Sequence, residues 1–484
     1  MIVAKNSVNE IDFDLSVANR HGLIAGATGT GKTVTLKVLA ELFSNNGVPV
    51  FLADVKGDLS GFAKANTLTP KLEKRLESMG LEDFSFDSFP LMLWDLYGKN
   101  GHPIHTTISD MGPLLLSQVL GLNETQGQVL SIVFKIADDN GLLLLDTKDL
   151  KAMLNFVSEN SATLKSEYGN ISAASVGAIL RALIVLENEG ADSFFGEPAL
   201  DIDDFLQTEG QKGVINLLNA TTLINSPKLY SSFLLWLLSE LFEKLPEVGD
   251  VEKPKFVFFF DEAHLLFDNA PKSLLDKIEQ VVRLIRSKGV GVYFISQSPL
   301  DIPDDVLGQL GNKFVHALRA YTPKDQKSIK AIAASFRQEK GDDVEESLLA
   351  LGVGEAMIST LDSNATPQFV QRAFIYPPQS AFSPLEEVEI KEHIKNSVIF
   401  GVYEQEIDRE SAYEILSAKA MKQNQIDSDI ADTYEKKEES SEIGKVLGAF
   451  ASSAARAIGS QVGRQIVRGI LGAILGDTSP KRRR

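Results

Sequence analysis

The sequence contains a glycine-rich loop of the type that binds phosphate groups. Residues 26–33 read GATGTGKT, which fits the pattern G-x-x-x-x-G-K-T. Backbone N–H groups of such a loop surround phosphate oxygens, the lysine neutralises them, and the final hydroxyl binds Mg²⁺. A glycine-rich turn with an unrelated lysine is the alternative. The predicted ligands of a nucleoside triphosphate are Gly26, Ala27, Thr28, Gly29, Thr30, Gly31, Lys32, Thr33 and Val34.

Two adjacent carboxylates lie far downstream of this loop. Asp261 and Glu262 follow the apolar run 256–260. Consecutive side chains of a strand point to opposite sides, so the two carboxylates can have different tasks. Asp261 is predicted to hold Mg²⁺, together with Thr33, and Glu262 to polarise the water that attacks the terminal phosphate. The alternative is an acidic pair that caps the next helix, and His264 fits a structural role as well as a catalytic one.

Three further polar residues stand near the ends of apolar runs. Gln297 ends one such run, where its side chain can contact the terminal phosphate or the attacking water, although a turn-stabilising amide is the alternative. Asp54 ends the run that should neighbour the phosphate loop, and Lys56 follows it. Asp54 and Lys56 either order the active site and its nucleotide or form a turn.

Arginines near the predicted core are candidates for stabilising negative charge in a transition state. In ring-shaped nucleotide hydrolases this arginine commonly comes from a neighbouring subunit. The alternative for any one of them is a solvated or ion-paired side chain. The candidates are Arg283, Arg286 and Arg319.

The elements that must position these residues can be read from the hydrophobic pattern. A short apolar run precedes the phosphate loop, and apolar residues at helical spacing follow it, so we expect strand, loop and helix in that order. Apolar runs without polar alternation suit strands buried on both faces of a parallel sheet. We therefore predict an α/β fold with a mostly parallel central sheet. The other predicted strands are residues 48–53, 214–218, 256–260, 291–296 and 313–318.

The chain is too long for one simple core, and its pattern changes along its length. About 200 residues separate Asp54 from Asp261, too many for a single crossover connection, so part of them should form an insertion. The predicted division is an ATPase core of residues 1–106 and 207–378, a helical insertion of 107–206, a small helical segment of 379–423, an acidic linker of 424–442 and a helical tail of 443–484.

Composition limits the kinds of chemistry that remain. The absence of cysteine excludes disulfide frameworks, thiol nucleophiles and cysteine-based zinc sites. A formal net charge of -18 argues against a surface that is basic everywhere, although a basic channel within an acidic particle gives the same total. No signal peptide and no run of roughly 18 apolar residues is recognisable, so we expect a cytoplasmic location.

The last forty residues have a composition of their own. Residues 443–476 are rich in glycine and alanine, carry apolar stripes interrupted by arginines, and precede a terminal KRRR. This pattern is compatible with docking on a protein or membrane surface. Packing between subunits through small residues is the alternative.

Several segments together resemble the HerA/FtsK superfamily of ATP-driven DNA translocases, and more closely the bacterial proteins with a HerA-like C-terminal domain. These segments are GATGTGKT, ADVKG, FFFDEAH, RLIRSKGVGVYFISQSP and NKFVHALRAYTPKDQ. The segments ADVKGDLSG, HPIHTTISDMGPLLLS and DRESAYEILSAKA are more specific than the phosphate loop. The resemblance extends from the first residue to the tail.

The resemblance implies a RecA-like P-loop core, Mg²⁺-dependent ATP hydrolysis and a homo-oligomeric, hexameric ring around DNA. By position, Lys32 and Thr33 take the nucleotide roles, Asp261 and Glu262 the metal and water roles, and Gln297 the sensor role. The phosphate loop begins too early for the β-barrel that precedes the motor in the archaeal helicase, so the resemblance leaves open whether that helicase's nuclease partner is shared. DEAH here lacks the companion motifs of the helicase class with that signature.

Two functions are consistent with these residues. The first is an oligomeric ATPase that moves DNA, with each site completed by the neighbouring subunit. The second is a non-motor ATPase switch or assembly factor, in which the nucleotide controls docking of the helical insertion or the tail. Stimulation of hydrolysis by DNA distinguishes the two functions. The core has no dense basic run with interleaved aromatic residues, so the expectation of DNA contact rests on the resemblance.

Overall fold

The fold is known from a computed structural model that describes residues 1–249, 251–267, 272–341, 343–422 and 425. These residues form two compact units. The first comprises Met1–His105 and Pro198–Glu406, and the second comprises Thr106–Glu197 with the described residues from Ile407 onward. The predicted linker of 424–442, apart from Gln425, and the predicted tail of 443–484 lie outside the described residues.

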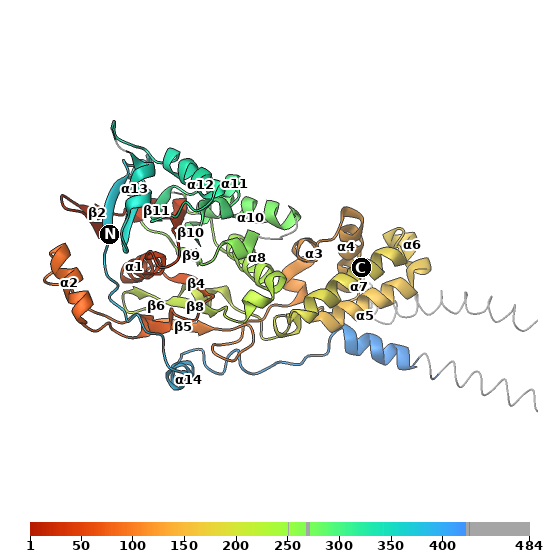
Figure 1. The fold of residues 1–484 in the computed structure, drawn as a ribbon. Coiled ribbons are helices and arrows are strands. Elements are labelled where there is room, and N and C mark those ends of the chain that lie inside the picture. Colours follow the sequence, from red (N-terminus) through yellow and green to blue (C-terminus); the bar gives the residue numbers. More distant parts are fainter. Residues whose placement is uncertain (250, 268–271, 342, 423–424, 426–484) are drawn as a thin grey trace, which may run out of the picture. The chain divides into compact units, whose positions relative to one another are not determined.

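The first unit is built on one large mixed sheet (Figure 1). In spatial order its described strands are β2 (Glu10–Asp12), β1 (Ile2–Lys5), β13 (Gln371–Ile375), β12 (Glu355–Ser359), β11 (Asn312–His316), β3 (Gly22–Ala25), β10 (Val290–Ser296), β9 (Phe256–Phe260), β4 (Val50–Asp54), β8 (Ile215–Asn219) and β5 (Leu91–Trp94). The strands from β11 to β5 are parallel, and those from β11 to β2 are antiparallel. A short hairpin of β6 (Thr208–Glu209) and β7 (Lys212–Gly213) is separate.

Helices of the first unit connect and cover these strands. They are α1 (Lys32–Asn45), α2 (Pro70–Met79), α8 (Pro227–Lys244), α9 (His264–Phe267), α10 (Lys272–Ile285), α11 (Asp304–Leu307), α12 (Pro323–Ala334), α13 (Val344–Ala350) and α14 (Glu387–Lys395). Its short 3₁₀ helices are η1 (Leu15–Arg20), η2 (Ser60–Ala63), η4 (Ile202–Leu206), η5 (Leu223–Asn225), η6 (Arg286–Lys288) and η7 (Pro299–Asp301).

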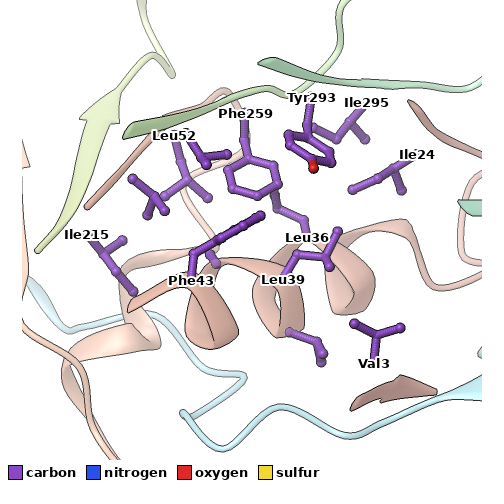
Figure 2. Close-up of a cluster of buried hydrophobic side chains, with 14 of the residues drawn as sticks. Val3, Ile24, Leu36, Leu39, Phe43, Leu52, Ile215, Phe259, Tyr293 and Ile295 are labelled. Atoms are coloured by element: carbon purple, nitrogen blue, oxygen red, sulfur yellow. The ribbon is translucent and has the colours of Figure 1, made fainter. Parts of the chain in front are cut away.

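Both faces of the parallel strands are buried. Figure 2 shows α1 beneath one face, where its apolar side chains meet those of the strands. The labelled residues on the two sides are Leu36, Leu39 and Phe43 from the helix and Ile24, Leu52, Ile215, Phe259, Tyr293 and Ile295 from the sheet. On the opposite face, Phe51 of β4 contacts Phe233 of α8. Helices on both faces explain why these strands are continuous apolar runs.

The predicted α/β fold with a mostly parallel sheet is confirmed. Each apolar run predicted as a strand forms one, and the run before the phosphate loop is β3. The pattern did not reveal β1, β2, β5, β12 and β13. All but β5 belong to the antiparallel extension, where each strand is short and includes at least one polar residue, so the apolar runs are short.

The second unit is helical. Its helices are α3 (Ile108–Val119), α4 (Glu124–Asp139), α5 (Thr147–Glu159), α6 (Ser161–Tyr168) and α7 (Ala173–Asn188), followed by η3 (Ala191–Ser193). Capping boxes begin α4 at Asn123 and α5 at Asp146, so local side chains satisfy the free N–H groups of both helices. No single helix in the described part of the chain is long and apolar enough to cross a membrane, although α6 and α7 pass that test as a pair bent by 100°.

Candidate nucleotide-hydrolysis site

The phosphate loop connects β3 to the first turn of α1. Three of its glycines have positive φ, 154° at Gly26, 76° at Gly29 and 123° at Gly31. A Cβ atom on Gly31 would lie 3.2 Å from Cε1 of His316 and 3.3 Å from Cα of Gly354, so both conformation and space require glycine there. No side chain caps the N-terminus of α1, which leaves this end of the helix suited to an anion.

Lys32 reaches back across the loop. Its Nζ donates to the carbonyl oxygens of Gly26, at 2.6 Å, and Ala27, at 3.2 Å. Burial lowers the pKa of Lys32, and the nearby carboxylates of Glu262 and Asp261 raise it in part. The lysine and the acidic pair are therefore close enough to interact, although they belong to distant parts of the sequence.

Asp261 and Glu262 follow the last residue of β9 and are both buried. Asp261 accepts a hydrogen bond from the N–H of Glu262 at 2.9 Å. Burial raises the pKa of Asp261 to about 6; Lys56 opposes this shift and the Glu262 carboxylate adds to it. For Glu262, burial acts in the same direction, but the Lys56 ammonium outweighs it and the pKa is lowered.

The expectation that the two carboxylates point to opposite sides is wrong. Both approach the same ammonium, since Nζ of Lys56 lies 2.8 Å from Oε1 of Glu262 and 3.8 Å from Oδ2 of Asp261. The alternation of side chains applies within an extended strand, whereas Glu262 lies beyond β9 and has φ of 49°. This left-handed backbone turns the second carboxylate toward the first.

Asp54 stabilises the turn that carries Lys56. Its carboxylate accepts hydrogen bonds from the N–H groups of Gly57, at 2.7 Å, Asp58, at 3.3 Å, and Leu59, at 3.0 Å. Burial raises the pKa of Asp54, and these hydrogen bonds reduce the shift. Turn formation, one of the two interpretations of this residue, is thus present in the structure, while a nucleotide contact of Asp54 stays a prediction.

A cavity of about 650 Å³ opens beside the phosphate loop. It is lined by Ala27 and Thr28 of the loop, His264 after the acidic pair, Gln297 at the end of β10 and Arg319 after β11. Thr28 Oγ1 donates to Oε1 of Gln297 at 3.4 Å. The remaining lining residues are Ser298, Asp301, Leu318, Tyr321, Asp325, Ser328 and Ile329. The structure therefore places Gln297 and one candidate arginine beside the loop.

The other two candidate arginines lie elsewhere. Arg283 is in the last turn of α10, and Arg286 begins the 3₁₀ helix that precedes β10. Because β10 is parallel to β3, its start lies at the edge of the sheet opposite the phosphate loop. Neither residue can therefore reach the phosphate loop of its own chain, and a role at a neighbour's site stays a prediction.

His316 supports the loop from β11 and was not singled out in the sequence. Its Nε2 accepts from Thr35 Oγ1 at 2.7 Å, and its Nδ1 donates to the carbonyl oxygen of Glu355 at 2.8 Å. Burial lowers the pKa of His316 to about 4, so the ring is neutral. A histidine within the apolar run 313–318 was the available signal.

Tyr230 is a second residue that the sequence did not reveal. It lies on α8, and its buried hydroxyl has no hydrogen-bond partner among the described residues. Burial raises the pKa of Tyr230, and the charges of Asp261 and Glu262 raise it further. An apolar helix such as α8 gives no signal that one of its tyrosines faces an acidic pair.

The residues present fit a magnesium–nucleotide complex. The loop has glycines with positive φ. A Cβ atom placed on Gly29 would have no atom within 4 Å apart from those of Gly29 and its two neighbours in the chain, so there is open space beside this glycine. Lys32 supplies a buried cation, Thr33 an available hydroxyl on the first turn of α1, and Asp261 a buried carboxylate. In addition, Oε2 of Glu262 is buried without a hydrogen-bond partner among the described residues, as expected for a group that awaits one.

Comparison with known proteins identifies related sequences. The family described as Helicase HerA-like C-terminal matches residues 1–482. The DNA double-strand break repair helicase HerA of Sulfurisphaera tokodaii is 24% identical over 375 residues, which cover 72% of this chain and 64% of that protein. A probable DNA double-strand break repair helicase HerA of Methanocaldococcus jannaschii is 34% identical over 109 residues, 22% of this chain and 20% of that protein. The chain thus spans less than two thirds of the length of these relatives.

Solved structures share the fold. The plasmid coupling protein TrwB in complex with the ATP analogue ADPNP superposes with a TM-score of 0.55 and 14% sequence identity, over 80% of this chain and 95% of that chain. Unbound TrwB superposes with a TM-score of 0.53 and 15% identity, over 80% of this chain and 92% of that chain. At this level of identity the likeness concerns the fold.

Proposed function

The chain belongs to the helicase HerA-like C-terminal family, and from that premise we propose that it is an ATP-hydrolysing motor that moves DNA. The observation that carries the proposal is the convergence of Lys32 and the Asp261–Glu262 pair, whose charges perturb one another at the end of the parallel strands. A cation, a phosphate loop and two buried carboxylates at one sheet edge are the parts that phosphoanhydride hydrolysis needs.

Each residue has a role in this proposal. The loop N–H groups and Lys32 bind the phosphates, and Thr33 and Asp261 would hold Mg²⁺, which would supply charge neutralisation to the phosphates. Glu262 accepts a proton from water as the water oxygen bonds to the terminal phosphorus and the bond to the leaving ADP oxygen breaks. Gln297, which lines the cavity beside Thr28, orients that water. Asp54 acts through the turn that carries Lys56.

The assembly we propose is a hexameric ring around DNA. The support is the family and the names of its relatives, which are DNA repair helicases. In such a ring Arg283 or Arg286 approaches the neighbour's phosphates, because neither can reach its own. We further propose a cytoplasmic location, and contact of the 443–484 tail with a protein or membrane surface.

Steady-state ATP hydrolysis with and without double- and single-stranded DNA tests the proposal. We expect stimulation by DNA. Lys32→Ala should abolish activity by removing the phosphate cation, and Glu262→Gln should lower kcat by about 10²–10⁴-fold while ATP still binds. Glu392→Gln, an exposed carboxylate on α14, is the matched control and should match the wild type.

Two outcomes would contradict this function. Hydrolysis that survives in Lys32→Ala and Glu262→Gln would show that the activity comes from a contaminant. A rate that is indifferent to both kinds of DNA at several salt concentrations would refute the motor and favour an ATPase switch.

A further inference from the structure

The ion pair between Lys56 and Glu262 connects the segments that follow two neighbouring strands of the sheet. Lys56 lies in the turn after β4, and Glu262 lies after β9, the neighbouring strand. Asp54 holds this turn with three hydrogen bonds to backbone N–H groups, so the position of Lys56 is set by its own segment. The Lys56 side chain is 45% exposed, whereas that of Glu262 is 9% exposed. An accessible cation therefore holds a buried carboxylate.

Glu262 is held in an unfavourable backbone conformation. Its φ of 49° is in the left-handed region, where the Cβ of a residue other than glycine is crowded. One carboxylate oxygen contacts Lys56, and the other lacks a hydrogen-bond partner in the described structure, with His264 Nδ1 at 3.5 Å. Strain of this kind persists where surrounding contacts enforce it, and it is common at switching sites.

One oxygen of the Glu262 carboxylate is occupied by the Lys56 ammonium, since Nζ of Lys56 lies 2.8 Å from Oε1. A carboxylate that activates water must lie within hydrogen-bond distance of it. An oxygen that is paired with an ammonium is a weaker proton acceptor, so release of the ion pair makes the Glu262 carboxylate a better general base.

We propose that Lys56 is a positioning residue that restrains Glu262 in a resting orientation, and that hydrolysis requires release of this ion pair. The inference rests on the proposed ATPase function. Any displacement of the turn 55–59, whether by DNA or by a neighbouring subunit, then changes the rate without touching the nucleotide. Lys56 thereby couples events at the end of β4 to the chemistry at the end of β9.

The experiment compares kcat and KM for ATP, without DNA, in the full chain and its variants. Lys56→Met and Lys56→Gln remove the cation, and Lys56→Arg keeps it. We expect the two neutral variants to raise DNA-free kcat roughly two- to fivefold with KM unchanged, the range that loss of one half-exposed ion pair allows. Lys56→Arg should restore the low rate.

Lys64→Met is the matched control. Lys64 lies on the segment after the same turn, is 40% exposed, and pairs with Glu389 away from the site. Its variant should retain the wild-type kcat. A similar rise in this variant would show that the effect is not specific to Glu262 and would overturn the proposal.

Other outcomes separate this inference from the function on which it rests. If the neutral variants are as slow as the wild type or slower, or if KM rises, Lys56 serves binding or the transition state and the restraint is refuted, while DNA-stimulated hydrolysis by the wild type stands. If the wild type is no faster than Lys32→Ala, the proposed function fails, and the restraint fails with it.

Discussion

His316 shows how a buried side chain far from the motif in sequence supports the phosphate loop. The ring lies between Thr35 on α1 and the carbonyl oxygen of Glu355, and it accepts from the first and donates to the second. This pair of contacts requires the neutral ring with a proton on Nδ1. A proton on both nitrogens would leave Thr35 facing a donor, so the charged form is disfavoured by hydrogen bonding as well as by burial.

The neutral state of His316 makes stability depend on pH. Burial lowers its pKa from 6.5 to about 4, so as pH falls through 6.5 the unfolded chain binds a proton that the folded chain does not. The contribution is complete above pH 6.5 and is lost as pH falls toward 4. Between about pH 7.5 and pH 5, we expect the free energy of unfolding to fall by about 2 kcal/mol more in the wild type than in His316→Gln.

Denaturant unfolding of both proteins at the two pH values measures this difference. The comparison concerns the change in the free energy of unfolding with pH in each protein. It is informative even if His316→Gln is less stable at neutral pH, because the two proteins differ only in the proton that His316 can bind. Asp261, whose burial raises its pKa, contributes with the opposite sign and cancels between the two proteins. Equal slopes would contradict a neutral buried His316.

Among single residues, those predicted from the sequence belong to motifs of consecutive residues. The phosphate loop and the acidic pair each form from consecutive residues, so their spacing reveals them. Lys56, which the sequence singled out without its partner, and His316 and Tyr230, which it did not single out, act through contacts between segments far apart in sequence. No local pattern encodes such contacts, so only the fold reveals them.

Among the elements, α1 is buried on its second side as well as against the sheet. Residues 377–385 cross it, and Glu41 accepts hydrogen bonds from the N–H of Gln379, the N–H of Ser380 and the hydroxyl of Ser380. Lys37 donates to the carbonyl oxygen of Ala381 at 2.9 Å and lies 4.1 Å from the ring centroid of Phe62. The helix that carries the phosphate loop is thus fastened by a distant segment.

Removal of Glu41 should loosen this fastening. Glu41→Ala leaves the buried N–H and hydroxyl of Ser380 and the partly buried N–H of Gln379 without their acceptor, and we expect a loss of about 2–4 kcal/mol in the free energy of unfolding. Glu41→Gln keeps one carbonyl oxygen and should lose less. Hydrogen exchange at the N–H groups of Gln379 and Ser380 should accelerate in both variants, and more in Glu41→Ala than in Glu41→Gln.

Glu387→Ala is the control for this prediction, since Glu387 is an exposed carboxylate on α14 whose partner is Lys391. It should leave stability and exchange unchanged. Unchanged exchange at Gln379 and Ser380 in Glu41→Ala would show that these N–H groups do not depend on the carboxylate.

The sequence rules for helices could not predict this arrangement. Lys37 and Glu41 are four residues apart on α1, a spacing that indicates a solvent-exposed face. Both are buried because residues 377–385 cover that face. The strands of the parallel sheet, in contrast, were predictable. Because both of their faces are buried, each strand is a short, continuous apolar run, which is typical of such strands.

For the whole molecule, the units are interleaved in sequence. The chain passes between them after His105, after Glu197 and again after Glu406. Within the second unit, Asp149 of α5 accepts from the hydroxyl of Ser411 and from the N–H of Tyr413. The sequence predicts a helical insertion of 107–206, but helical periodicity carries no information on which later segment returns to these helices.

The proposed ring predicts cooperation between subunits. A chain that lacks its trans-acting arginine keeps Glu262 in its own site, and a neighbouring Glu262→Gln chain can supply the arginine to that site. We therefore expect a mixture of Glu262→Gln with Arg283→Ala or with Arg286→Ala to be more active than either variant alone. Arg319→Ala should not be rescued, since Arg319 lines the cavity of its own chain.

ATP hydrolysis after subunit exchange measures this complementation, and sedimentation checks that the mixtures assemble as the wild type does. Rescue of Arg319→Ala alone would reassign the arginine. Absence of rescue in every mixture would contradict a site completed by these arginines of a neighbour.

The pairing of β1 with β13 has a consequence for how the chain is made. Ala4 is opposite Ile375, so the two strands that close the antiparallel side of the sheet are separated by most of the first unit and all of the inserted helices. At roughly 5–20 residues per second, a ribosome needs about 20–75 s to make the residues between them. During this interval β1 can pair with β2 but lacks β13, and the edge of β1 that faces β13 is open to other chains. The β1–β2 pair is therefore among the last parts of the chain to join the sheet, and a holding chaperone would act most usefully on its open edge.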